Sequence, residues 1–170
     1  MNDNQKTDYC NGNIYYDFLD YAFQRTDYFM LVYVNYYGKG YSKVMKQFRN
    51  ALKTFEIKSR SNARWPGTIG TLCANTSYKV IFYKNDERAK EILKEVNCIS
   101  QWSGPLYPQD LAFFSGNQCW FYSVGHEKIA AIIHASKQDL EFVEGKGLAM
   151  QKDAYNATDD YFDAYDEKLN

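Results

Sequence analysis

Residues 102–127 read WSGPLYPQDLAFFSGNQCWFYSVGHE and carry the most specific pattern in the chain. The prolines at 105 and 108 disfavour helix at the residue before each of them, so residues 103–109 should be extended or turned. Two runs of aromatic and β-prone residues follow, at 111–115 and 119–124, and the glycine-containing loop between them is typical of a hairpin. With residues 129–135 as a third strand, this region predicts an antiparallel meander.

The segments on either side of the meander show helical and strand periodicities. Apolar residues at helical spacing predict helices over 13–24, 43–54, 87–96 and about 136–144. Residues 28–37 are nearly all apolar and β-prone, which predicts a strand buried on both faces. Residues 56–63 suggest an edge strand or a loop, and the runs 68–74 and 77–83 suggest a hairpin that turns at Asn75 and Thr76.

Together these elements predict an α+β fold, with a mostly antiparallel sheet of five to seven short strands and helices packed on one face. The chain has 170 residues, a length typical of one domain that can bury its own core. We divide it into a flexible N-terminus (1–12), a single α+β domain (13–150) and an acidic, aromatic C-terminal tail or helix (151–170).

Charge and composition narrow the class of protein. The formal net charge is −1, so no overall positive field attracts a polyanion and nucleic-acid binding is disfavoured. The sequence shows no signal-peptide pattern and no membrane-spanning apolar run, which predicts a cytoplasmic protein without membrane contact. The cysteines stand singly and only two histidines are present, so we expect free thiols, no metal site and no cofactor. The cysteines are Cys10, Cys73, Cys98 and Cys119.

The aromatic fraction is high, at 18%, and many of the rings stand beside turns. In Arg64-Trp-Pro-Gly-Thr68 the Pro-Gly turn should hold Trp65 on a rigid corner. There the indole either covers the core or forms a binding platform beside Arg64. Tyrosine and tryptophan give large contact area at low entropic cost, so a recognition surface is predicted from the aromatic residues and their polar neighbours. Its candidate residues are Arg64, Trp65, Trp102, Tyr107, Asp110, Trp120 and His126.

The candidates for catalysis are His126, Glu127 and Cys119. His126 is a possible general acid–base with Glu127 as its orienting carboxylate, and Cys119 is a possible nucleophile. Neighbouring residues of a strand point to opposite faces, so His126 and Glu127 share a site only if they lie in a turn. The structural alternative is a histidine that fixes the turn of the meander through a backbone hydrogen bond.

Both aromatic blocks resemble one family. The residues RWPGT at 64–68, the pattern W-x-x-P-x-Y-P-x-D-L-x-F-F at 102–114, CW at 119–120 and SVGHE at 123–127 are similar to a group of small bacterial proteins. Some members of the group carry the label stage III sporulation protein AH. The resemblance implies no established activity and therefore assigns no site residue.

The function that the sequence favours is a small cytoplasmic binding or interaction protein, of the inhibitor, immunity or counter-defence type. Its partner is a protein or a small-molecule ligand, and its oligomeric state is not predicted. The alternative is a small enzyme that uses His126 and Glu127 as acid and base. A third hypothesis takes the acidic C-terminal tail as a mimic of nucleic acid.

Overall fold

The computed structural model describes residues 12–69, 73–148 and 151–152. Of the N-terminus predicted to be flexible only Gly12 is described, and of the predicted acidic tail only Gln151 and Lys152. The interpretation of the tail as a helix or a nucleic-acid mimic therefore lies outside the described residues.

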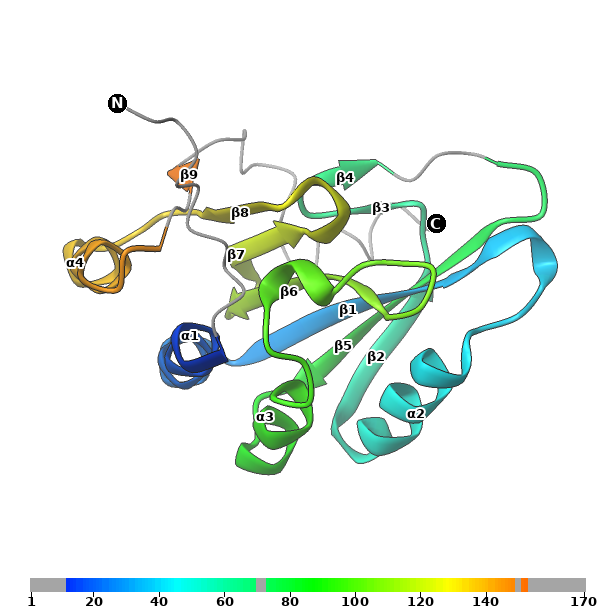
Figure 1. Ribbon diagram of the computed structural model, residues 1–170, viewed down its shortest axis with the longest axis horizontal. Helices are drawn as coiled ribbons and strands as arrows, with labels where there is room; N and C mark the ends of the chain where they lie inside the picture. The colour runs from blue at the N-terminus through cyan, green and yellow to red at the C-terminus, as the bar shows by residue number, and fades with distance from the viewer. Residues whose placement is uncertain (1–11, 70–72, 149–150, 153–170) are drawn as a thin grey trace.

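A seven-stranded sheet runs through the molecule in the order β2-β5-β1-β6-β7-β8-β9 (Figure 1). Neighbouring strands from β2 to β8 are antiparallel, and the short β9 pairs in parallel with β8. The strands are β1 (Tyr28–Asn35), β2 (Glu56–Ser61), β5 (Ser77–Lys84), β6 (Gln109–Ser115), β7 (Gln118–Val124), β8 (Ile129–Ile132) and β9 (Gln151–Lys152). Two further strands, β3 (Arg64–Trp65) and β4 (Thr68–Ile69), form a separate hairpin.

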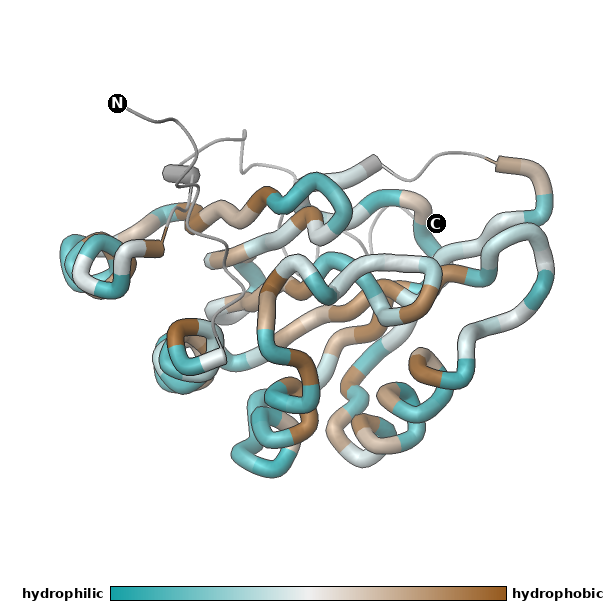
Figure 2. The backbone as a smooth tube through the Cα atoms, viewed as in Figure 1, coloured by the Kyte–Doolittle hydropathy of each residue, from teal (hydrophilic) through white to brown (hydrophobic). Residues whose placement is uncertain are grey.

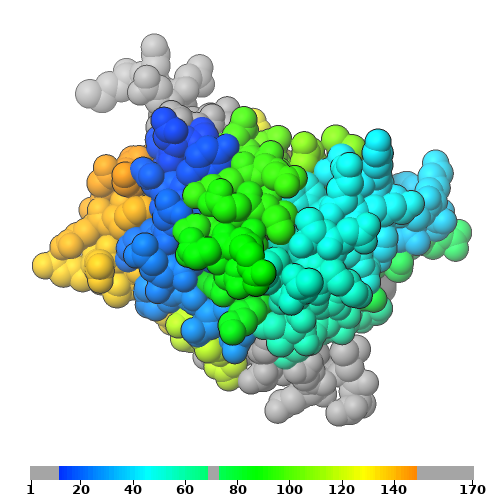
Figure 3. All heavy atoms as spheres, turned by 90° about the horizontal axis from the view of Figure 1, so that it is seen from below, coloured from blue at the N-terminus to red at the C-terminus, as the bar shows by residue number. Residues whose placement is uncertain are grey.

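Helices lie side by side across one face of the sheet, in the order α4, α1, α3, α2 (Figure 3). Their bounds are α1 (Gly12–Arg25), α2 (Lys43–Ala51), α3 (Glu87–Leu93) and α4 (Lys137–Gly145). Three of them begin at a side-chain cap, because Ser42, Asp86 and Ser136 each accept a hydrogen bond from a backbone N–H of the first turn. The predicted α+β fold with helices on one face is confirmed.

The central strands are buried on both faces, and this creates two cores. In β1 the residues alternate between them, with Phe29 and Leu31 in the core under the helices and Met30 and Val32 in the core on the other face. Apolar residues follow the central strands in Figure 2. Trp65 of the β3–β4 hairpin belongs to the second core, so the hairpin packs on the sheet face opposite the helices.

Two local predictions differ from the structure. The segment at Thr68 pairs with β3 at Trp65, whereas β5 pairs with β1 and β2, so the hairpin predicted from 68–74 and 77–83 is wrong. Instead, the two-residue turn Pro66-Gly67 brings Thr68 opposite Trp65, as in a short antiparallel hairpin. The second helix also ends at Ala51, and a 3₁₀ turn, η2 (Lys53–Phe55), leads into β2.

Cys98 is disulfide-bonded. Cys73 is an exposed thiol and Cys119 a buried thiol, neither of them in a disulfide, while Cys10 lies outside the described residues. The expectation of free thiols is therefore wrong for Cys98. Among the described helices, none combines the length and the apolar character needed to cross a membrane.

Candidate binding pocket beside Asp110

Asp110 is the second residue of β6 and has a left-handed backbone, with φ of 60°. The pairing of β1 with β6 shifts register next to it, between Met30 and Val32. Its backbone N–H donates to the carbonyl oxygen of Trp102 at 3.1 Å instead of continuing the ladder. Aspartate is one of the few residues that accepts this conformation readily. The side chain is thereby turned away from the regular alternation of the strand.

Asp110 is only 1% exposed. Its carboxylate connects β6 with the β3–β4 hairpin and with the turn after β7. Oδ2 accepts hydrogen bonds from Nε1 of Trp65 at 2.8 Å and, more weakly, from Oγ1 of Thr68 at 3.4 Å. Oδ1 accepts from the backbone N–H of Gly125 at 3.0 Å. Burial raises the pKa of Asp110, although the hydrogen bonds from Trp65 and Gly125 and the nearby His126 act against this rise.

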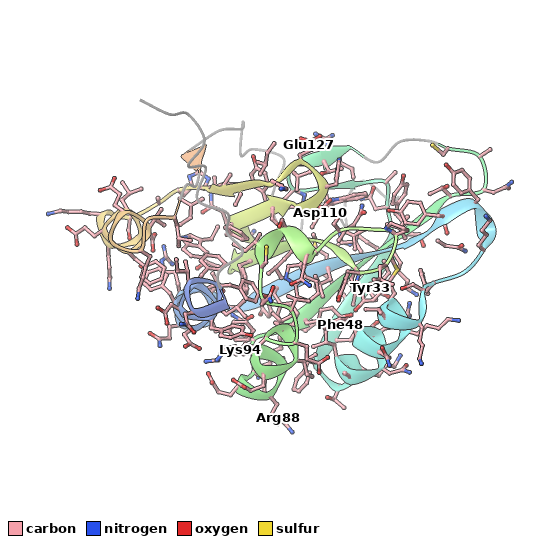
Figure 4. All side chains as sticks on the ribbon, in the orientation of Figure 1. Tyr33, Phe48, Arg88, Lys94, Asp110 and Glu127 are labelled. Carbon is pink, nitrogen blue, oxygen red and sulfur yellow. The ribbon has the colours of Figure 1, made fainter. Side chains whose placement is uncertain are left out.

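A pocket of about 400 Å³ opens beside this carboxylate, between the hairpin and the ends of the sheet strands. Two adjacent members of its wall, His126 and Glu127, lie in the 3₁₀ turn η4 (Gly125–Glu127). The lining residues are Tyr36, Trp65, Gly67, Thr68, Tyr78, Gly104, Gln109, Val124, His126 and Glu127. In Figure 4, Asp110 and Glu127 lie on the hairpin side of the molecule, away from Arg88 and Lys94 on the helix side.

Because His126 and Glu127 lie in a turn, both side chains reach the same pocket. They are 58% and 56% exposed, and Nε2 of His126 is 3.6 Å from Oε1 of Glu127. This distance suits an ion pair when the histidine is protonated. The requirement that the two residues lie in a turn is thus met, and a catalytic role for them stays a prediction.

Two glycines allow close contacts around the pocket. A Cβ on Gly125 would collide with the carbonyl oxygen of Trp102, and one on Gly104 would collide with the hydroxyl of Tyr36. The hydroxyl of Tyr36 in turn donates to Oε1 of Gln109 at 3.2 Å. Both glycines therefore set the positions of pocket components.

The tryptophans of the predicted recognition surface are not exposed. Trp65, Trp102 and Trp120 are at most 3% exposed. Each indole N–H has an acceptor inside the protein, which removes the cost of burying it. Trp65 donates to Asp110, Trp102 to the hydroxyl of Tyr15 at 3.0 Å, and Trp120 to Asp139 at 3.2 Å. Of the three, only Trp65 lines the Asp110 pocket.

The other predicted site residues lie apart from this pocket. Tyr107 packs against Phe48 and lines a different hollow between helix α2 and the segment before β6. Arg64 is partly exposed at the start of the hairpin. Cys119 is 1% exposed near the start of β7, whereas His126 follows the end of that strand. At about 3.3 Å per residue the two cannot form a nucleophilic pair.

Asp139 provides a contrast to Asp110, since it is buried and also accepts an indole hydrogen bond. Its oxygens accept from the hydroxyl of Tyr21 at 2.7 Å, Nε of Arg25 at 3.2 Å, Nε1 of Trp120 and the backbone N–H of Ser136. Burial opposes ionisation, but the hydrogen bonds outweigh it and lower the pKa of Asp139. Asp139 is thus a fully satisfied part of the α4 capping box.

Tyr36, Tyr78 and Gln109 were not predicted as site residues. Tyr36 follows β1, and Tyr78 is near the start of β5, so their meeting depends on the pairing of these strands. A weak signal existed in the sequence, because Tyr36 and Tyr37 continue the apolar run of β1 into a glycine-containing turn.

Comparison of the chain with protein-family models, with curated proteins and with solved structures finds no match. The resemblance of the aromatic blocks to a bacterial family stays a prediction, and the pocket is interpreted from its own residues.

Proposed function

We propose that the chain is a small binding protein whose ligand site is the pocket beside Asp110. The observation that carries this proposal is a buried carboxylate with a left-handed backbone, placed behind a pocket that aromatic side chains line. The volume of about 400 Å³ is in the range of small-molecule sites. Strained backbone and perturbed pKa values gather at functional sites more often than elsewhere.

The three tryptophans provide the experiment. In a ¹H–¹⁵N spectrum the three indole N–H groups give three side-chain signals, and only Trp65 lines the pocket. A chemically diverse set of small molecules is titrated into the labelled protein. A ligand of the pocket shifts the Trp65 signal in a saturable way, while the signals of Trp102 and Trp120 serve as internal controls. If no compound shifts Trp65 selectively, the proposal is wrong.

The partner is proposed to be a small molecule or a single side chain of a protein partner, because the site is a pocket and the tryptophans are not on the surface. The inhibitor, immunity and counter-defence types are all compatible with such a site. Nucleic acid remains disfavoured by the net charge of −1.

A second candidate function is general acid–base catalysis by His126 and Glu127. Their shared position in the wall of the pocket favours it. Catalysis predicts that a ligand found by NMR is converted over hours, and that His126→Ala stops the conversion while changing affinity only a few-fold. A ligand whose own spectrum stays unchanged under wild-type protein excludes this alternative for that ligand.

The cytoplasmic compartment stays a prediction. The disulfide at Cys98 argues against it, because disulfides persist mainly in oxidising compartments.

A further inference from the structure

The wall of the Asp110 pocket includes three aromatic side chains, Tyr36, Trp65 and Tyr78. The ring centroids of Trp65 and Tyr78 are 5.2 Å apart and their planes are tilted by 48°, so the two rings form a corner. Tyr36 and Tyr78 are partly exposed, whereas Trp65 is 2% exposed and backs Tyr78. Aromatic faces attract a cation that lies within about 6 Å of the ring centroid.

Two carboxylates lie at or close to the pocket. Glu127 stands on the rim and Asp110 lies behind the wall, bonded to Trp65 and Thr68. Among the described lining residues none is a lysine or an arginine. The pKa of Tyr36 is raised by burial and, to a smaller extent, by Tyr78 and by the charge of Asp110.

The hydrogen bond from Trp65 to Asp110 polarises the indole. An N–H that donates to a carboxylate becomes more polarised, and electron density moves into the indole ring. The negative potential over the aromatic corner rises with it. The buried carboxylate thus acts on the pocket through the ring as well as directly.

We infer that the Asp110 pocket binds an organic cation, namely an ammonium group carried on a small apolar frame. This inference rests on the proposed ligand site. Val124 and the tyrosine rings suit methyl or methylene groups around the nitrogen, while Glu127 and Asp110 balance its charge. An anion would meet Glu127 on the rim, with Asp110 behind the wall, and the described lining residues include no lysine or arginine to pair with it.

The test compares choline with 3,3-dimethylbutan-1-ol, which has the same shape and no charge. Both are titrated into the labelled protein at equal ionic strength while the Trp65 indole signal is followed. Choline shifts this signal in a saturable way, and the neutral alcohol binds about tenfold more weakly, as expected for a partly desolvated cation beside aromatic rings. Butylammonium and butan-1-ol form a second pair, and butyrate serves as the anionic probe.

Two variants test whether Glu127 and Tyr78 contribute to the binding of choline. Glu127→Gln weakens choline binding about two- to fivefold, since an exposed carboxylate contributes little in water. Its matched control is Glu141→Gln, which removes the same charge from the exposed face of α4 and leaves binding unchanged. Tyr78→Leu weakens choline binding about tenfold but leaves the affinity of the neutral alcohol within about twofold.

The outcomes separate this inference from the proposed function. If the neutral alcohols bind as well as the ammonium compounds, or if only butyrate binds, the cation inference is wrong and the ligand pocket stands. If neither ammonium compound shifts Trp65 while other compounds do, the inference is again wrong. If no compound of any class shifts Trp65, the ligand site itself fails.

Discussion

Nε1 of Trp65 lies 2.8 Å from Oδ2 of Asp110, and neither residue is more than 2% exposed. This bond joins the β3–β4 hairpin to the sheet. The pair of Trp120 and Asp139 has the same chemistry, yet Asp139 also accepts from the guanidinium of Arg25. The described hydrogen bonds to Asp110 come only from neutral groups, and the pKa of Asp110 is raised where that of Asp139 is lowered.

Asp110→Asn should lower the free energy of unfolding by about 1–3 kcal/mol at neutral pH. Asparagine keeps the left-handed backbone, but its amide has one acceptor oxygen for donors that now bind both carboxylate oxygens, so Trp65 or Gly125 loses its partner. The measurement is urea unfolding of both proteins. A variant as stable as the wild type would show that these hydrogen bonds do not hold the hairpin.

The same pair of proteins should differ in pH dependence. Because the folded pKa of Asp110 is above the ordinary value of 3.8, the folded state binds this proton more tightly than the unfolded state. Its contribution to stability is full below pH 3.8 and is lost as pH rises through the folded pKa. The wild type should therefore gain stability relative to Asp110→Asn as pH falls through this window. If the stability of the wild type relative to Asp110→Asn instead increases as pH rises, the raised pKa is contradicted.

Asp139→Asn should show the opposite dependence. The folded pKa of Asp139 is below 3.8, so its contribution is present above that pH and is lost as pH falls through the folded pKa. Replacement should cost about 2–4 kcal/mol at neutral pH, since Arg25 and the cap of α4 lose a buried acceptor. Unfolding curves of the variant and the wild type from pH 2 to 7 test both statements.

Gly125→Ala should destabilise the protein by about 1–3 kcal/mol, because the added Cβ meets the backbone oxygen of Trp102, which cannot rotate away. The control is Gly145→Ala, at the end of helix α4, where a Cβ meets nothing within 4 Å. There alanine should be neutral or stabilising by up to about 1 kcal/mol. Equal thermal stability of the two variants would exclude the close packing at Gly125.

Tryptophan fluorescence should report a wholly buried set of indoles. All three tryptophans are at most 3% exposed, so native emission should be blue-shifted and weakly quenched by iodide. Unfolding in guanidinium should shift the emission to longer wavelength and restore quenching. Strong quenching of the native protein would instead support the recognition surface predicted from the sequence.

Thiol reactivity should distinguish the cysteines. In the native protein a thiol reagent should modify Cys73 quickly and the buried Cys119 only after unfolding, while Cys98 should react only after reduction. Peptide mapping without reductant identifies the partner of Cys98. Rapid alkylation of Cys98 in the unreduced protein would show that no disulfide forms there.

Local patterns of the sequence predicted much of the fold. Helices α3 and α4 begin at or next to the predicted residues 87 and 136, and the β6–β7 hairpin follows its turn residues. These features depend on residues that are close in sequence. The abundance of aromatic residues was wrongly taken to indicate exposed tryptophans. A sheet buried on both faces accommodates many more aromatic rings in its cores than a sheet with one solvent-exposed face.

The candidate site was predicted only in part. Asp110, Trp65, His126 and Glu127 were selected from their turns, but the tyrosine wall was not. Tyr36 and Tyr78 come together through the pairing of β1 with β5, in which Asn35 lies opposite Ser77. No local pattern fixes such a register, since it depends on which strands become neighbours.

The contacts of Trp102, Asp110 and Gly125 have a consequence for the order of folding. The bonds from Asp110 to Trp102 and from Gly125 to Asp110 close short loops within residues 102–127, whereas the bond from Trp65 to Asp110 closes a much longer one. Short loops close faster, because less chain entropy is lost before the contact forms. The β6–β7 unit should therefore form early, and the hairpin that carries Trp65 should dock onto it later.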